Sequence, residues 1–406
     1  MTSISVLPRA VRRAGLTAAL VGVCASPAIG QSFKIGDKEV HVHGSLQQGF
    51  GVTDQNNVLT MDTTSGSGAM TDAAINATSS LTPKLRAGAQ VYLRNIGQLG
   101  DGHVEVDWAF ADYKFHQAFG VRGGKMKTVL GLYTDTQDME FLYTWALLPQ
   151  GTYPLDLRSV TIAHVGGDVY GEAKIGKAGS INYTGYYGIL QDDSHGGYRY
   201  GLQDSSINFR AGVESRGGGF DARWMAPVNG LLAGYSYNQT RLDAQLVYKP
   251  PTLPVSVNFV AVTSPWRRQA VYGDYQASRL HLSTEFRREL QFSQVTPKIF
   301  NTSPTPSQNW FAAASYRASK YLEVGSYYSH YVYNINLPAA PANNHIYDKV
   351  VSARVDVTSW WNVKVEGHFI DGTGSATFAH GFYRRDNPGG FKPTTNMLVI
   401  RTGVNF

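Results

Sequence analysis

Hydrophobic and polar residues alternate one by one along most of the chain. In residues 85–94, apolar or small side chains occupy the odd positions and mostly polar side chains the even positions. Successive side chains of a β-strand point to opposite faces, so a period of two predicts strands with one apolar and one polar face. The same alternation occurs in residues 241–248, 280–287, 350–357, 362–369 and 398–406.

Three features distinguish a membrane barrel from a water-soluble sandwich. The alternating segments run for about 9–11 residues, the length of a tilted strand that crosses a bilayer. Their polar faces carry charges, whereas their apolar faces carry almost none. Short connections, such as 82–84 and 318–320, alternate with long ones, such as 53–68 and 371–394, and this pattern is typical of outer-membrane barrels. We therefore predict an all-β fold, a transmembrane antiparallel β-barrel.

The number of strands is less directly encoded. Eighteen segments qualify as candidate strands, among them those that begin near residues 231 and 240, and several, such as the one near 218, are weak. Bacterial single-chain barrels have an even number of strands, and two of the segments can be hairpins within loops. We predict sixteen strands, with eighteen as the alternative, in one domain that spans residues 31–406.

Composition narrows the class of protein further. Charged residues make up 16% of the 406 residues, whereas about 25% is typical of soluble domains. Aromatic residues make up 12%, led by 24 tyrosines, which excludes a disordered chain. Beyond the N-terminal segment the sequence has no apolar run of about 18 residues, and this argues against a helical membrane protein.

The first thirty residues have the pattern of a secretion signal. Three arginines precede a short apolar run at 14–23, and small residues at 28–30 fit a cleavage before Gln31. The only cysteine, Cys24, lies in this segment, so the exported chain would contain neither a disulfide nor a thiolate metal site. We expect residues 1–30 to direct export and the remainder to reside in the bacterial outer membrane, in contact with its lipid.

The charge balance excludes a further class. The formal net charge is +6. Removal of the three signal arginines leaves 33 basic and 30 acidic residues, or +3. The chain has no block of lysines and arginines, so we expect no nucleic-acid partner.

A wide barrel encloses water unless something narrows it. The candidate for this role is the segment 131–158, which is long and lacks the alternation of the strands. Long ordered loops tend to be functional, and we predict that this one folds inward as a constriction loop. Asp135, Asp138 and Glu140 would then present acidic groups to the channel. The alternative is a loop that covers the outer rim.

Basic residues on the polar faces would oppose this acidic loop. Arg86, Arg94 and Arg122 lie on predicted inward faces. Lys125 and Lys127 are out of phase with Arg122, and a β-bulge at the two intervening glycines would turn both lysines inward. Acid facing base would give a transverse field that favours polar solutes. The other residues that we expect to line the lumen are Arg354, Lys364, Glu366 and Arg401.

Part of the lumen charge is expected to neutralise itself. Arg241 and Asp243, like Glu285 and Arg287, lie two residues apart on one predicted lumen face. Residues at this spacing are same-face neighbours in a strand. The small basic excess that remains predicts a weak preference for anions.

Two stretches of the chain resemble Gram-negative outer-membrane porins, including the phosphate-selective type. The first spans 85–133 and includes Arg-Gly-Gly-Lys-Met-Lys at 122–127, and the second spans 356–368 together with the terminal Phe406. The resemblance fades between 200 and 340. It implies a sixteen-stranded passive channel with an inward third loop, assembled as a homotrimer.

We therefore expect passive diffusion of small hydrophilic solutes and ions, with no catalytic step, cofactor or metal. Two alternatives stay open, namely an outer-membrane hydrolase acting on lipids or peptides, and a closed structural or adhesive barrel. Among the eleven histidines, His41 and His43 share a strand face, but two histidines are a weak indication of a metal site. The sequence lacks the Gly-x-Ser-x-Gly and His-Glu-x-x-His motifs of hydrolases.

Overall fold

The computed structural model describes residues 30–406, except 159–160, 191–193, 253, 339–340 and 375–379. The predicted signal segment, apart from Gly30, lies outside the described residues. No helix in the described part of the chain is long and apolar enough to cross a membrane.

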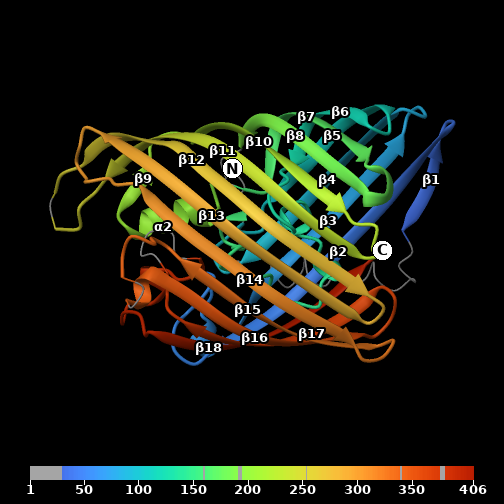
Figure 1. Cartoon of the computed structure of the whole chain (residues 1–406). Helices are drawn as coiled ribbons and strands as arrows, with labels where there is room; N and C mark the ends of the chain where they lie inside the picture. The colour runs from blue at the N-terminus through green and yellow to red at the C-terminus, as the bar shows by residue number, and fades with distance from the viewer. Residues whose placement is uncertain (1–29, 159–160, 191–193, 253, 339–340, 375–379) are drawn as a thin grey trace, which may run out of the picture.

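Sixteen antiparallel strands form a closed barrel (Figure 1). Each strand pairs with its neighbours along the chain, β8 pairs with β10 across the short β9, and β18 pairs with β2 to close the ring. The strands are β2 (Lys38–Thr53), β3 (Ser67–Ser80), β4 (Leu85–Ile96), β5 (Val104–His116), β6 (Phe119–Lys127), β7 (Ala163–Lys174), β8 (Ser180–Leu190), β10 (Glu214–Met225), β11 (Leu231–Tyr248), β12 (Val257–Ala277), β13 (Leu280–Thr296), β14 (Thr305–Arg317), β15 (Leu322–Val332), β16 (His345–Asp356), β17 (Trp361–Asp371) and β18 (Thr394–Asn405).

The remaining elements are short. Strand β1 (Gln31–Ile35) forms a hairpin with the start of β2, and β9 (Ile207–Phe209) adds to the far end of β11. The one α-helix of the described residues is α2 (Gly197–Asp204), and single 3-10 turns occur at Thr63–Ser65, Thr134–Thr136, Glu140–Leu142, Gly176–Ala178, Ala342–Asn344 and Arg384–Asp386.

The predicted strand number is confirmed. The two candidate strands near 231 and 240 are one continuous strand, β11, interrupted only by a register shift between Thr240 and Leu242 in its pairing with β12. The extra residue lies on β12, and the inward positions of β11 stay in phase across the shift. The sequence pattern changes there because the inward residues turn from polar, such as Ser236 and Asn238, to apolar, such as Leu242 and Ala244.

The two ends of the barrel differ. Connections at one end, which we call the turn end, are short, such as 117–118 and 278–279, and β1 and the C-terminus lie there as well (Figure 1). Connections at the other end, the loop end, are mostly long, such as 128–162 and 372–393, and α2 and β9 lie there. This difference matches the pattern of transmembrane barrels.

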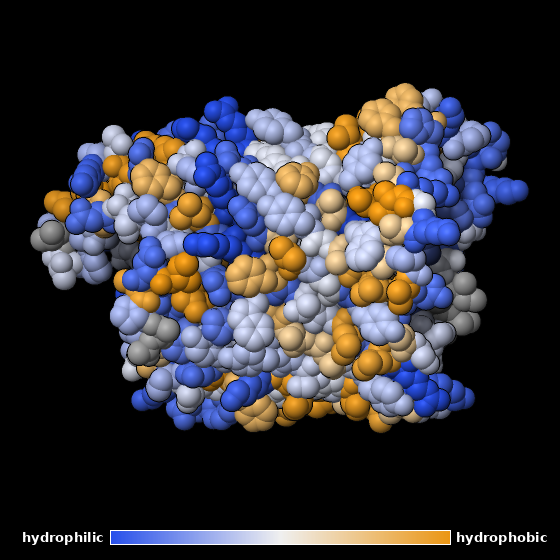
Figure 2. Space-filling view, viewed as in Figure 1, coloured by the Kyte–Doolittle hydropathy of each residue, from blue (hydrophilic) through white to orange (hydrophobic). Residues whose placement is uncertain are grey.

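Side chains alternate between the lumen and the exterior along each strand. In β17, Lys364, Glu366 and His368 are buried inside the barrel, while Val365 and Phe369 are exposed outside. Apolar residues therefore cover much of the outer wall, and Figure 2 shows hydrophilic side chains gathered mainly toward the ends of this face. Charged side chains are buried inside because the lumen contains other parts of the chain.

The inward face of residues 241–248 was predicted wrongly. Leu242, Ala244 and Leu246 point inward and pack with Leu202 of α2, whereas Arg241 lies outside and pairs with Asp243 at 2.7 Å. This part of β11 lies toward the loop end, where the segment containing α2 fills the mouth of the barrel. Because apolar side chains occupy this part of the lumen in place of water, the inward face of the strand is apolar here and the outward face is polar.

Candidate functional site

The connection between β6 and β7, residues 128–162, folds into the barrel and is called the inner loop here. Near its start, Gly131 has a φ of +78°, a conformation that favours glycine. The Gly131 amide donates to the Ser236 hydroxyl on β11 at 2.9 Å, on another part of the wall. The predicted inward course of the segment 131–158 is therefore what the structure shows.

Aromatic side chains anchor the inner loop to the strands opposite β6. Tyr133 stacks against Phe311 of β14 with ring centroids 6.0 Å apart. Trp145 meets Tyr327 of β15 edge-on at 5.1 Å. These rings belong to one buried cluster, so burial of aromatic surface favours the docked position of the loop.

Charged side chains of β17 and β18 bind the backbone of the loop. The Glu366 carboxylate accepts the amides of Ala146 and Leu147, each at 3.0 Å. The Lys364 ammonium donates to the Trp145 carbonyl at 2.8 Å. The Arg401 guanidinium donates to the Ala146 carbonyl at 3.0 Å. The wall thereby satisfies backbone groups that would otherwise be buried without partners.

A second charged anchor lies on β13. Glu285 accepts the Leu132 amide at 2.8 Å and also the Tyr153 hydroxyl. Arg287 donates to the Thr152 carbonyl at 3.0 Å and forms an ion pair with Glu285 at 2.8 Å. One pair of wall residues thus binds both the beginning and the later part of the loop.

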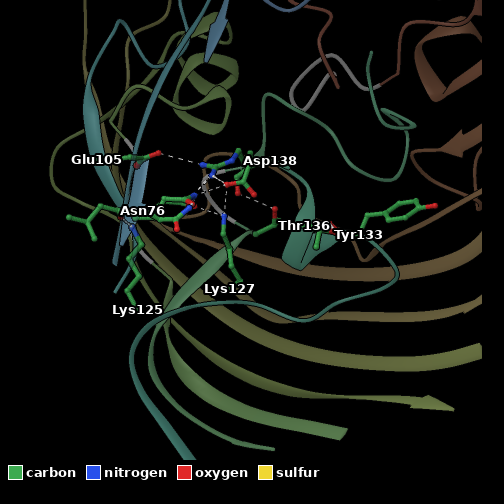
Figure 3. Close-up of polar contacts among 12 residues, drawn as sticks. Asn76, Glu105, Lys125, Lys127, Tyr133, Thr136 and Asp138 are labelled. Atoms are coloured by element: carbon green, nitrogen blue, oxygen red, sulfur yellow. Dashed lines mark hydrogen bonds and ion pairs between the residues drawn. The ribbon is translucent and has the colours of Figure 1, made fainter. Parts of the chain in front are cut away.

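The loop is tied to its own side of the barrel by a compact ionic network (Figure 3). Asp138 accepts from Lys127 at 2.8 Å and from Arg158 at 3.0 Å. Arg158 also pairs with Asp107 of β5 at 2.6 Å and lies over the Tyr92 ring at 4.1 Å. Because Arg158 is only 1% exposed, loss of either carboxylate would leave a buried charge without a full complement of partners.

The remaining predicted residues also hold the loop. Arg354 donates to the carbonyls of Phe141 and Tyr143 at 2.6 and 2.9 Å. Arg94 donates to a loop carbonyl, that of Leu155, at 3.4 Å. Glu140 pairs with Arg401. Burial raises the pKa of the Glu140 carboxyl to about 7, and the Arg401 guanidinium opposes this shift.

Cavities lie on both sides of the inner loop. The turn-end cavity has a volume of about 350 Å³ and lies between the loop and the wall formed by β5, β6, β8 and β10. The loop-end cavity has a volume of about 380 Å³ and lies between the loop, α2 and the far halves of β11–β14. The charged residues that line the turn-end cavity are Arg122, Lys127, Asp135, Asp221 and Arg223.

The structure brings only some of the predicted lumen residues to this cavity. Arg122, Lys127 and Asp135 line it, and Arg86 lies near the turn end in an ion pair with Asp112 at 3.2 Å. Lys125 does not line the cavity. It is paired with Ala109 of β5 and Val165 of β7, and its side chain lies on the outward face of the sheet.

The expected bulge that would turn Lys125 inward is absent from β6, because the register of β6 with β7 is continuous over Gly120–Lys127. Lys127 reaches the lumen without it, at the last paired position of the strand.

Sequence reasoning missed two charged residues of the cavity, Asp221 and Arg223. They lie on β10, and the Ser236 hydroxyl on β11 donates to Asp221 at 2.6 Å. Arg223 donates to Asp135 of the loop at 3.3 Å. The run of glycines at 217–219 hides the alternation of β10, although the spacing of Asp221 and Arg223 on one face was a usable signal.

Comparisons with known proteins show the fold. Neither a protein-family model nor the sequence of a curated protein matches the chain. Solved structures do match: OmpT, an outer membrane protein of Vibrio cholerae, is 13% identical with a TM-score of 0.59, and the match covers 93% of this chain and 100% of that one. The anion-selective porin of Comamonas acidovorans is 10% identical with a TM-score of 0.54, covering 91% and 100%. OmpF of Salmonella typhi, in complex with daunomycin, is 12% identical with a TM-score of 0.54, covering 93% and 100%.

The chain therefore has the fold of the Gram-negative outer-membrane porins. At these identities the similarity is one of fold, namely the barrel.

Proposed function

We propose that the protein is a channel of the bacterial outer membrane through which small hydrophilic solutes and ions diffuse passively. The observation that carries this proposal is the closed sixteen-stranded barrel whose lumen is narrowed by its own inner loop, with a cavity on each side of that loop. A barrel of this width cannot be filled by wall side chains alone. Its exterior apolar residues suit contact with lipid.

The path of the solute follows the wall formed by β8 and β10. Elsewhere the loop is bound closely, by Lys127 at the end of β6, by Glu285 on β13 and by Glu366 on β17. On β10 its charged contact is the longer one between Arg223 and Asp135, at 3.3 Å. Polar side chains of β8, such as Asn182 and Thr184, line the turn-end cavity without a hydrogen bond to the loop in the described structure.

The charge of this path supports a weak preference for anions. Arg122, Lys127 and Arg223 contribute three positive charges to the turn-end cavity, and Asp135 and Asp221 contribute two negative ones. The net charge of the lining is therefore +1. A charged constriction biases the choice of ion, and a single net charge in an aqueous passage gives a modest bias.

Conductance in a planar bilayer tests the proposal. The purified full chain should give stepwise openings, and in a salt gradient its reversal potential should favour anions. The double variant Arg122→Gln and Arg223→Gln should shift the reversal potential toward cations. The matched control removes two exposed lysines of the turns, Lys84→Gln and Lys177→Gln, and should not shift it.

Absence of openings from folded protein would refute the channel. An unchanged reversal potential in the double variant would refute the proposed path, even if the channel conducts.

The proposed assembly is a homotrimer. Support comes from the resemblance of the sequence to porins and from OmpT of Vibrio cholerae, which has been described in a trimer form. Light scattering of the detergent-solubilised protein would measure the mass of the complex, and a monomeric mass in several mild detergents would contradict the trimer.

For the hydrolase alternative, the structure contains a hydrogen-bonded set of three side chains, but the nucleophile in this set is not accessible. The Thr128 hydroxyl lies 3.1 Å from Nδ1 of His164, and Nε2 of His164 lies 2.8 Å from Asp168. This is the connectivity of a nucleophile, base and acid. Thr128 is, however, 0% exposed, so a lipid or peptide substrate could not reach it. Turnover of such a substrate that is lost on His164→Gln would overturn this reasoning.

A further inference from the structure

Four arginines lie on the exterior of four consecutive strands. Arg216 of β10, Arg241 of β11, Arg267 of β12 and Arg288 of β13 are all exposed, and each alternates with inward-pointing neighbours. In Figure 2 a band of hydrophilic side chains crosses β11–β13 on the side of the loop end. We call these four residues the arginine row.

The register of the strands places the members of the row next to one another. Arg216 pairs directly with Arg241. Arg267 pairs with Gln239, two residues from Arg241, and Arg288 pairs with Gln269, two residues from Arg267. Direct and diagonal neighbours on one face of a sheet lie about 5–8 Å apart. The row therefore crosses three interstrand spacings, or about 14 Å.

The row lies at one level of the barrel. Arg241 is ten residues beyond Leu231, the first residue of β11 at the turn end. At about 3.3 Å per residue and a tilt of about 40°, this corresponds to about 25 Å along the barrel axis. The same reasoning places Arg288 about 20 Å from the turn end of β13. The apolar band of a membrane barrel is about 25 Å tall, so the row marks its edge at the loop end.

The wall between the row and the turn end is apolar. Its exposed exterior residues on these strands include Phe220, Tyr235, Val271 and Phe286, and none of the outward positions there is charged. The strands also continue past the row, by seven residues in β11. The guanidinium groups thus lie where lipid headgroups would meet the barrel.

The positive charge of the row is only partly compensated. Arg241 forms a two-pronged ion pair with Asp243 at 2.7 and 2.8 Å, and Arg267 donates to the neutral Gln239 at 3.1 Å. Arg216 and Arg288 have no carboxylate partner among the residues that the structure describes. With Glu214 as the other exterior acid of the patch, four positive charges face two negative ones.

We propose that the arginine row binds the phosphate groups of anionic lipids in the leaflet at the loop end. A guanidinium binds phosphate with two parallel hydrogen bonds, and a positive charge at a membrane surface is attracted to anionic lipid. The length of the row suits more than one phosphate group. This inference rests on the membrane placement proposed above, and it does not depend on conduction.

Lipid titration of the full-length protein in neutral detergent tests the row. The probe is diphosphoryl lipid A, with monophosphoryl lipid A and zwitterionic phosphatidylcholine as comparisons, and native mass spectrometry counts the bound lipids. The protein should prefer the diphosphoryl lipid. The variant with Arg216, Arg241, Arg267 and Arg288 all changed to Gln should bind it at least tenfold more weakly.

A matched control removes four positive charges at the opposite end of the barrel. The exposed turn residues Lys84, Lys177, Arg279 and Lys320, all changed to Gln, should leave the affinity for lipid A within about twofold. Folding of the variant with all four arginines changed is judged by heat-modifiable mobility in gels. If that variant does not fold, the double variant Arg216→Gln and Arg288→Gln takes its place, because it removes only the two arginines without a carboxylate partner. This pair should weaken binding by a smaller but measurable factor.

Three results would overturn the proposal. They are an unchanged affinity of the folded row variant, an equal loss in the turn-end control, and a change of oligomeric mass in the row variant with lipid affinity intact. The last result would assign the row to contact between copies of the chain. If the wild-type protein gives no channel openings but keeps its lipid preference, the channel fails and the lipid site stands.

Discussion

Glu366 is the wall residue whose removal should most directly release the inner loop. Its carboxylate is 0% exposed and accepts the amides of Ala146 and Leu147 at 3.0 Å each. Glu366→Gln keeps the shape of the side chain. It replaces one acceptor oxygen with an NH₂ group, which cannot accept a hydrogen bond from an amide, and it removes the negative charge that strengthens both bonds.

The size of the effect follows from these two hydrogen bonds. A hydrogen bond to a charged group contributes about 1.5–3 kcal/mol, and the variant loses at least one of them. Each 1.4 kcal/mol corresponds to a factor of ten in an equilibrium. The local opening of the segment around Ala146 should therefore become about 10- to 150-fold more frequent, while the loop stays docked through Glu285 on β13.

Hydrogen–deuterium exchange measures this opening directly. Amides of the loop near Ala146 should exchange about 10- to 150-fold faster in Glu366→Gln, and amides in the middle of β11 should be unaffected. Glu214→Gln, which changes an exposed exterior carboxylate, is the control. Wild-type protection at Ala146 in the folded variant would show that Glu366 does not hold the loop.

Three further predictions concern the same loop. Arg158→Ala removes the buried partner of Asp107 and Asp138 and should destabilise the barrel by about 3–5 kcal/mol. The temperature at which the folded band converts to the unfolded band in gels should therefore fall, and an unchanged temperature would contradict the network. Because the pKa of Glu140 is raised to about 7, its negative charge is lost as the pH falls from 8 to 6, so anion preference should increase over that range. In Glu140→Gln the change of the reversal potential over this pH range should be smaller than in the wild type, and an identical pH response would refute the assignment. Gly131→Ala places a methyl group against the Glu285 carboxylate at a positive φ and should accelerate amide exchange at the start of the loop, whereas Gly68→Ala, which has open space around it, should not.

Much of the barrel could be predicted from the sequence because alternation is a local property. The inward positions of β17, including Lys364 and Glu366, follow directly from the period of two. The inward course of the segment 131–158 was inferred from its loss of alternation. These conclusions require no knowledge of which strands are neighbours.

The roles of the charged residues were harder to predict because they depend on contacts across the barrel. Glu366 and Arg401 were expected to face water, yet they bind the backbone of the inner loop. Their partners lie more than 200 residues away in the sequence. No local pattern identifies a carbonyl or an amide as the partner of a distant side chain.

By itself the sequence determined the class of fold and the segment that enters the lumen, since both depend on periodicity and length along the chain. Periodicity left eighteen candidate strands, and the pairing of the strands in the structure shows that sixteen close the barrel. Only the tertiary structure decided which face of β11 lies inside near the loop end, and what each charge contacts. At residues 241–248 the same alternation is present, but the apolar face points inward because α2 and its neighbours fill the mouth. A strand carries two faces wherever it lies, and the surroundings on each side determine which face is buried.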